Sequence, residues 1–243
     1  MNHSIVFGDG TLYPAGDRKE GQFKGIDTYK DWFLIPATRP TIAMPGIESK
    51  FVSIPGRDGT IDLSDYLRER PAYGDRGGSF TFNVENDNEF WMTIYPKIVN
   101  TLHGKRFKMV LEEDDPDYYW EGRFTVSEWR SDSYWSTVTI NYQIGPWKRR
   151  IRKVLDGMIW DTFNFEQDYD YDPWDLGHIT VNGETWSKDI WCDGYPFVPE
   201  IKILSGSPSV SFQGENGHAK YGFNRLTVSG TGTVSVNWRG GSL

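Results

Sequence analysis

The chain has 243 residues, 37% of them hydrophobic and 25% charged, which excludes a disordered protein and suits one large β domain or two small ones. Its net charge of −8 argues against a protein that grips phosphate backbones, so we expect no sequence-specific nucleic-acid partner.

The N-terminal sequence has no basic segment followed by a long apolar stretch. No window approaches the roughly 18 apolar residues of a membrane-spanning helix. We therefore expect no membrane span and synthesis in the cytoplasm. Cys192 is the single cysteine, which excludes an intrachain disulfide and predicts a small packed residue.

The first distinctive element is "FVSIPGRDGTIDLSDYL" (51–67), which superficially resembles a phosphate-binding loop. That loop needs a lysine after its second glycine, and Thr60 stands there instead. Alternating apolar residues predict a β-hairpin over 51–63, with Pro55 and Gly56 at the centre of a type II turn. A ligand-binding loop is the alternative. Arg57 and Asp58 at the tip are candidate subunit contacts.

Alternation of apolar and polar residues predicts several further short, half-buried strands. They lie at 78–86, 106–113, 122–129, 136–144, 200–206, 209–214, 225–230 and 233–240. Many short strands are typical of β-sandwiches and barrels.

One segment, 89–107, has apolar residues at helical spacing. Because proline is tolerated only in the first turn, we predict one short helix from about Pro96 to His103, ending at Gly104.

Five basic residues occur within 148–153, after a strand that ends at Gly145 and Pro146. They predict a domain boundary, with one domain at 1–150 and a second at 151–243. The segment is either a solvated connector or a strap that pairs with a neighbouring subunit. In the second case Lys148, Arg149 and Arg150 are candidate subunit contacts.

Three acidic clusters, 85–89, 112–117 and 168–175, raise the possibility of calcium binding or of a glycoside hydrolase. None has the ligand spacing of an EF-hand. A hydrolase would require one essential carboxylate, and the candidates are Glu112, Glu113, Asp114 and Asp115. No serine-nucleophile or cysteine-protease motif is present. We expect no catalytic residue, no cofactor and no metal.

Aromatic residues are abundant, with eleven Trp, thirteen Tyr and fourteen Phe. Several lie in polar settings, among them Trp186 and Trp191. Trp and Tyr are favoured at interfaces and as stacking surfaces for sugars, which favours a binding or assembly protein.

Six segments in this order resemble the distal tail protein (Dit) of long-tailed phages. They are "DWFLIP" (31–36), "VSIPGRDGTIDLSDYL" (52–67), "GGSFTFNV" (77–84), "LHGK" (102–105), "DDPDYYWEGRFTV" (114–126) and "PWKR" (146–149). The resemblance covers nearly all of residues 1–148. The remainder is similar in position and character to the galectin-like C-terminal β-sandwich of that family.

The resemblance implies a mainly β chain of two β-sandwich domains, the first ring-forming with one short helix and the second galectin-like. It implies a non-catalytic homohexamer at the virion tail tip, contacting the tail tube protein, the tail-associated hub protein and a receptor-binding protein. The galectin lactose motif is absent, because His218 is followed by "AKYGFNR" and Trp186 by "SKD". The alternative function is a glycan-binding adhesion module for the host cell surface.

Overall fold

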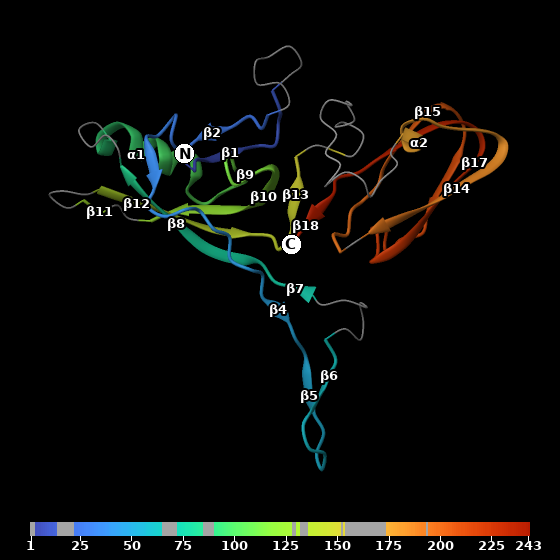
Figure 1. Ribbon diagram of the computed structural model, residues 1–243, viewed down its shortest axis with the longest axis horizontal. Coiled ribbons are helices and arrows are strands. Elements are labelled where there is room, and N and C mark those ends of the chain that lie inside the picture. The colour runs from blue at the N-terminus through green and yellow to red at the C-terminus, as the bar shows by residue number, and fades with distance from the viewer. Residues whose placement is uncertain are drawn as a thin grey trace. The chain divides into compact units, whose positions relative to one another are not determined.

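Antiparallel strands contain most of the residues that the computed structural model describes (Figure 1). The structure describes residues 3–13, 22–64, 72–84, 90–127, 130–131, 136–151, 153, 174–192 and 194–243. The chain divides into two compact units, Met1–Ile151 with Leu243 (unit 1) and Arg152–Ser242 (unit 2). The predicted mainly β fold class is confirmed.

The main sheet of unit 1 is antiparallel, with strand order β2-β1-β9-β10-β12-β8-β3. These strands are β1 (Ile5–Gly8), β2 (Ile26–Asp27), β3 (Leu34–Pro36), β8 (Arg76–Val84), β9 (Lys105–Leu111), β10 (Asp115–Val126) and β12 (Ser136–Ile144). Two short strands extend it: β11 (Arg130–Ser131) pairs with β12, and β13 (Lys148–Arg150) pairs with β10.

The apolar residues of the alternating strands form the core of unit 1. On β12, Val138, Ile140 and Ile144 are fully buried, and the residues between them are largely less buried. Phe82 of β8 and Phe124 of β10 pack in the same cluster. The period-two pattern therefore predicted which face of the sheet is covered.

The predicted helix of unit 1 is confirmed as α1 (Tyr95–Leu102), with a π-helix, η1 (Phe90–Ile94), in front of it. Pro96 lies in the first turn and has no N–H to donate to the carbonyl of Met92, so a regular α-helix cannot continue unbroken through this point. Leu102 is fully buried in the core, and Gly104 ends the helix with φ +75°.

The predicted hairpin is also confirmed and forms part of an arm that leaves the body of unit 1 (Figure 1). β4 (Ile47–Glu48) pairs with β7 (Ala72–Tyr73) near its base, and β5 (Phe51–Ser53) pairs with β6 (Thr60–Asp62) further out. The N–H of Arg57 donates to Ile54 O at 3.2 Å and Gly56 has φ +82°, which is the predicted type II turn.

Unit 2 contains a sheet in the order β14-β17-β15, with β16 also paired to β17. Its elements are α2 (Trp174–Gly177), β14 (Ile179–Cys192), β15 (Glu200–Gly206), β16 (Ser209–Phe212), β17 (Gly222–Asn237) and β18 (Gly241–Ser242). The two halves of β17 meet at Gly230 and Gly232, which both have positive φ, and both halves bring apolar side chains to one core. Cys192 is buried in this core, as predicted.

Candidate assembly surfaces

The predicted basic segment is a strand rather than a solvated connector over Lys148–Arg150, because β13 pairs with Tyr118 and Tyr119 of β10. Lys148 Nζ lies 2.7 Å from Asp115 Oδ2 and 4.4 Å from the centroid of the Tyr118 ring. The Lys148 ammonium therefore has an anionic partner and an aromatic face within its own chain.

The two arginines of β13 have partners in unit 1 as well. Arg149 Nη1 lies 3.6 Å from Glu121 Oε2, and Arg150 Nε donates a hydrogen bond of 3.3 Å to the hydroxyl of Tyr118. All three basic residues are half-buried. They can present part of their charge to a second chain. Their contacts with Asp115, Glu121 and Tyr118, however, hold β13 against β10.

The other two predicted contact residues, Arg57 and Asp58, lie at the tip of the arm and are exposed. In Figure 1 this tip is far from β13, so the structure does not bring the two groups of predicted contacts together. Open space surrounds Gly56 and Gly59 beside them. The tip can therefore be reached from all sides by another molecule.

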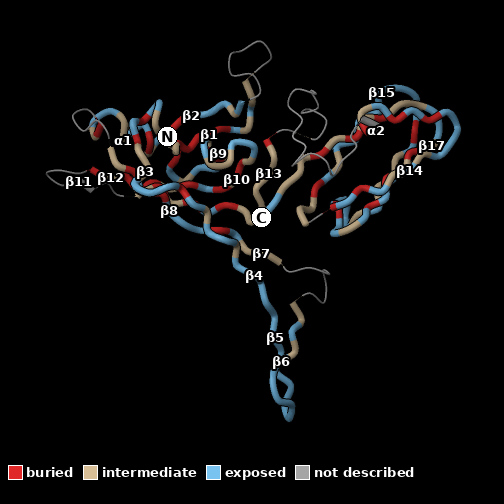
Figure 2. Tube along the Cα trace, viewed as in Figure 1, coloured by how far each residue is buried: buried red, intermediate tan, exposed pale blue. Residues whose placement is uncertain are grey.

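The arm carries exposed apolar side chains that the sequence did not single out as surface residues. Phe51 is 59% exposed, and the others are Met44, Ile47, Val52 and Ile54. Figure 2 shows β5 and the turn of the outer hairpin as exposed, whereas β6 is partly half-buried. An apolar surface of this kind on a projecting element is typical of an interaction site.

Arg76 holds the base of the arm, although its side chain lies in the interior and is only 4% exposed. Its Nε and Nη2 donate to Pro146 O at 2.8 and 2.6 Å, and its Nη1 donates to Ala43 O at 3.2 Å. Burial lowers the pKa of Arg76. The same segment is held from the other side, where Ala43 N donates to the hydroxyl of Tyr142 at 3.3 Å.

Gly78 makes the contact between Tyr142 and Ala43 possible. The two residues Gly78 and Tyr142 are directly opposed on β8 and β12. A Cβ atom at Gly78 would lie 2.3 Å from the Tyr142 hydroxyl. A larger residue at position 78 would therefore collide with the Tyr142 side chain, which reaches past β8 to Ala43 at the base of the arm.

The acidic cluster at 112–117 makes structural ion pairs with basic residues far away in the sequence. Glu112 Oε2 lies 3.0 Å from Lys30 Nζ, and Asp114 Oδ1 lies 2.6 Å from Arg39 Nε. Asp114 Oδ2 also lies 3.1 Å from His3 Nδ1. These bonds join the turn between β9 and β10 to the N-terminal segment, which gives the cluster a structural use.

Of the other two acidic clusters, 85–89 lies outside the described residues, and so does 168–173 of the third. Among the residues that the structure describes, no group of three or more His, Cys, Asp or Glu side chains could hold a metal ion. Over the same ranges, no helix is long and apolar enough to cross a membrane.

This chain is similar in fold to solved structures, although no sequence relative is found. No protein-family model and no curated protein matches this sequence. Among solved structures, the crystal structure of the SPP1 Dit (gp 19.1) protein matches 98% of this chain and 99% of its own, with a TM-score of 0.58 and 11% identity. The chain has a Dit-like fold.

The SPP1 Dit protein is described as a paradigm of the hub adsorption apparatus in phages that infect Gram-positive bacteria. The Dit-like fold extends over both units, so the resemblance seen mainly in residues 1–148 is confirmed as a fold for nearly the whole chain. At 11% identity the match carries the fold and not the contacts of individual residues.

Arg76, which fixes the arm to the body of unit 1, was not among the residues predicted from the sequence. The one local signal was an arginine followed by two glycines at the head of an alternating strand, in "RGGSF". Its partners Ala43 and Pro146 are 33 and 70 residues away, beyond the range of local patterns.

Proposed function

We propose that this chain is a structural, non-catalytic protein of a phage tail tip that assembles into a homohexameric ring. In this role it would join the tail tube protein to the tail-associated hub protein and the receptor-binding protein. The full-length Dit-like fold carries the proposal. Residues 1–150 would form the ring, and residues 151–243 would be a galectin-like domain.

The arm supplies a physical means of assembly. Phe51 and the neighbouring apolar side chains are exposed to water in the single chain. Burying one such side chain in a neighbouring subunit contributes about 1.5 to 3 kcal/mol. Arg57 and Asp58 at the tip, and the half-exposed cations of β13, would add polar contacts that set the register between subunits.

Mass photometry and negative-stain imaging of the purified protein test the proposal. We expect particles of six times 28.0 kDa with six-fold symmetry and a central hole. Phe51→Ala should weaken assembly by about tenfold or more. Ile203→Ala, which truncates an exposed apolar residue of unit 2, is the matched control and should assemble normally.

A ring of a different rotational symmetry contradicts the hexamer. Assembly that is unaffected by Phe51→Ala and by Arg57→Ala would show that the arm is not the contact, even if the ring forms.

A further inference from the structure

The outward face of β14 and β17 in unit 2 carries an ordered set of side chains. Strand register places Trp191 opposite Phe223, and Asp189 opposite Arg225. These four residues are exposed, and Ile190 between them is buried in the core. Since alternate residues of a strand share a face, the two pairs lie side by side on the surface, roughly 7 Å apart along the strands.

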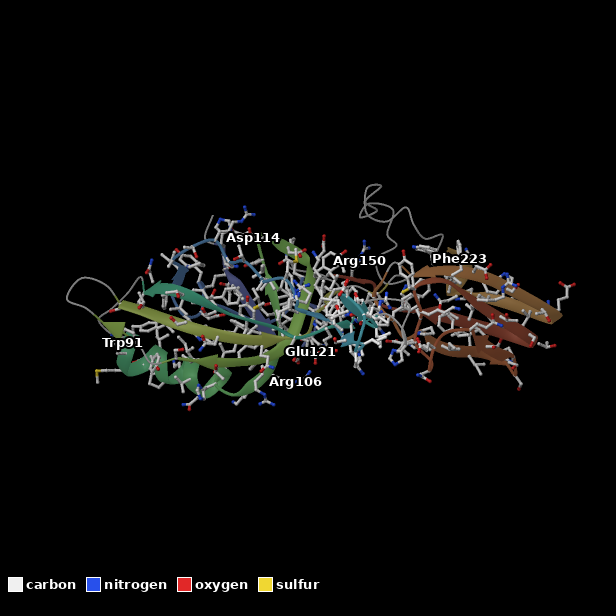
Figure 3. The ribbon with its side chains drawn as sticks, turned by 90° about the horizontal axis from the view of Figure 1, so that it is seen from below. Trp91, Arg106, Asp114, Glu121, Arg150 and Phe223 are labelled. Atoms are coloured by element: carbon white, nitrogen blue, oxygen red, sulfur yellow. The ribbon has the colours of Figure 1, made fainter. Side chains whose placement is uncertain are left out.

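The first pair belongs to an aromatic platform, which we define as Trp191, Tyr221 and Phe223. Their exposed fractions are 39%, 54% and 66%. The Trp191 ring centroid lies 4.9 Å from that of Phe223 and 5.8 Å from that of Tyr221, with the ring planes at 70° and 61°. Figure 3 labels Phe223 on unit 2. The rings fix one another in place and still leave much of their surface in water.

The second pair is a planar polar group beside the platform. Arg225 Nε donates to Asp189 Oδ1 at 2.8 Å, and its Nη2 donates to Oδ2 at 2.9 Å. A guanidinium has five N–H donors, so this bidentate pair leaves donors on Arg225 and lone pairs on Asp189 for a ligand. The hydrogen bond from Arg225 lowers the pKa of Asp189, so the carboxylate is an acceptor at neutral pH.

Hydroxyl groups form the next row on the same face. Ser187 lies opposite Thr227 on β17, and Thr227 in turn lies opposite Ser211 on β16. The surface thus changes in steps from aromatic rings, through a paired acid and base, to hydroxyls.

We propose that this face of unit 2 binds a neutral polysaccharide, with a pyranose ring packed against the aromatic platform and its hydroxyls bonded to Asp189 and Arg225. A pyranose has an apolar face of C–H groups and a rim of hydroxyls that both donate and accept hydrogen bonds. The apolar face suits the aromatic rings, and the hydroxyls suit the ion pair and the hydroxyl row beside them.

Other classes of ligand fit the surface less well. The centre of a protein interface is depleted of charged groups, and here an ion pair adjoins the rings directly. A polyanion would meet a neutral pair on a chain of net charge −8. The galectin lactose motif is absent around His218 and Trp186. The platform does not include these two residues, so the absence of the motif does not argue against this site.

Affinity electrophoresis of the full chain tests the proposal, with gels that contain a mixed-linkage β-glucan, a galactomannan or dextran. We expect at least one of these polymers to retard the protein. Trp191→Ala, Phe223→Ala and Arg225→Ala should each weaken the apparent affinity about tenfold. Phe223→Tyr, which keeps the ring, should bind as the unchanged protein does.

Two further variants make the result specific. Ile203→Ala removes an exposed apolar side chain of the same unit away from the platform and should bind normally. Phe223→Leu keeps an apolar side chain but removes the ring, so it should bind as weakly as Phe223→Ala. Melting curves of all variants check that each is folded.

The proposal is overturned if none of the three polymers retards the chain, or if Ile203→Ala weakens binding as much as Phe223→Ala. Full binding by Phe223→Leu would also overturn it, because that result indicates a hydrophobic docking surface for a protein. Particle mass separates this site from the ring: Trp191→Ala should leave the mass unchanged, whereas Phe51→Ala should lower it and leave each chain's platform intact.

Discussion

Arg76 is a buried cation whose hydrogen bonds all end on backbone carbonyls. Carbonyl oxygens stabilise the guanidinium without a counter-charge. The contribution of Arg76 to stability therefore depends on the geometry of its three N–H donors. We expect Arg76→Met, which preserves the packing of the stem, to lower the free energy of unfolding by about 1 to 3 kcal/mol because two carbonyls lose their donors. Urea denaturation measures the change.

The matched control for Arg76 is Arg57→Ala at the exposed tip of the arm, which should leave the unfolding free energy within about 0.5 kcal/mol of the original. If Arg76→Met is as stable as Arg57→Ala, the buried hydrogen bonds of Arg76 contribute nothing net, and the arm is positioned by the pairing of β4 with β7 and by the Ala43–Tyr142 hydrogen bond.

Asp27 gives unit 1 a pH-dependent stability. Burial raises the pKa of Asp27, but hydrogen bonds from the side chain and backbone N–H of Lys30 outweigh it, so the pKa lies below its ordinary value of 3.8. Lys30 Nζ is 2.7 Å from the carboxylate, and the pKa of Lys30 is raised above its ordinary 10.5 by this bond.

The sign of the effect follows from these two shifts. A carboxyl with a depressed pKa in the folded state stabilises the protein above pH 3.8, and this contribution is lost as the pH falls through the folded-state pKa. The contribution of Lys30 is present below pH 10.5 and is lost as the pH rises above that value. Thermal melting should therefore show a plateau between these limits, and Asp27→Asn should lower the plateau and flatten its acid side. An unchanged acid side in Asp27→Asn would show that other carboxylates cause the loss.

At the scale of elements, glycine has two different uses in unit 1. Gly78 allows a close approach between strands, because a Cβ would lie 2.3 Å from the Tyr142 hydroxyl. Tyr142 is buried and stacked on Phe80 with ring centroids 4.8 Å apart, so it cannot move freely. We expect Gly78→Ala to destabilise unit 1 by about 1 to 3 kcal/mol, measured by urea denaturation.

Gly56→Val strains a different element. The backbone at Gly56 has φ +82°, which a β-branched residue avoids, but open space surrounds it. The strain should stay within the outer hairpin, so the urea midpoint of unit 1 should hardly change and ring assembly should weaken. The strain is not passed to the main sheet because β5 and β6 form a separate two-stranded sheet. A large loss of stability in Gly56→Val would show that the hairpin folds as one with the body.

Local chemistry explains which elements were predictable. The turn at Pro55 and Gly56 and the helix end at Gly104 depend on the backbone preferences of single residues, which the sequence displays directly. β14 was not predicted, because its middle section has exposed polar residues and Gly183 in place of regular alternation. Alternation also shows which side chains share a face but not what covers that face, and this is why the exposure of Phe51 was not foreseen.

The candidate sites were less predictable than the elements because they depend on pairings between distant segments. Arg57 and Asp58 are neighbours in a hairpin, and their place at a tip followed from the turn. The opposition of Trp191 and Phe223 depends on the register of β14 with β17, which the sequence does not reveal. Trp191 was noted for its polar setting alone.

For the whole molecule, the net charge of −8 bears on the proposed ring. A channel that passes DNA would hold the DNA back if cations lined it, because each phosphate that pairs with a Lys or Arg releases counterions and adds affinity. The three consecutive basic residues of β13, Lys148 to Arg150, are half-buried and have partners within unit 1. The basic strand β13 should therefore not form a face that binds duplex DNA.

We expect no shift of a duplex DNA fragment in gel electrophoresis with the assembled protein, either in about 50 mM salt or in about 150 mM salt, where electrostatic attraction is more strongly screened. Glu121→Gln offers an internal control, because it removes a carboxylate that lies 3.4 Å from Arg106 and 3.6 Å from Arg149, and so uncovers positive charge. Weak retardation by this variant in low salt alone would show that the assay detects such a surface. Retardation by the unchanged protein that weakens as salt is added would mean that the assembled protein has a cationic face, and the prediction drawn from the net charge would be wrong.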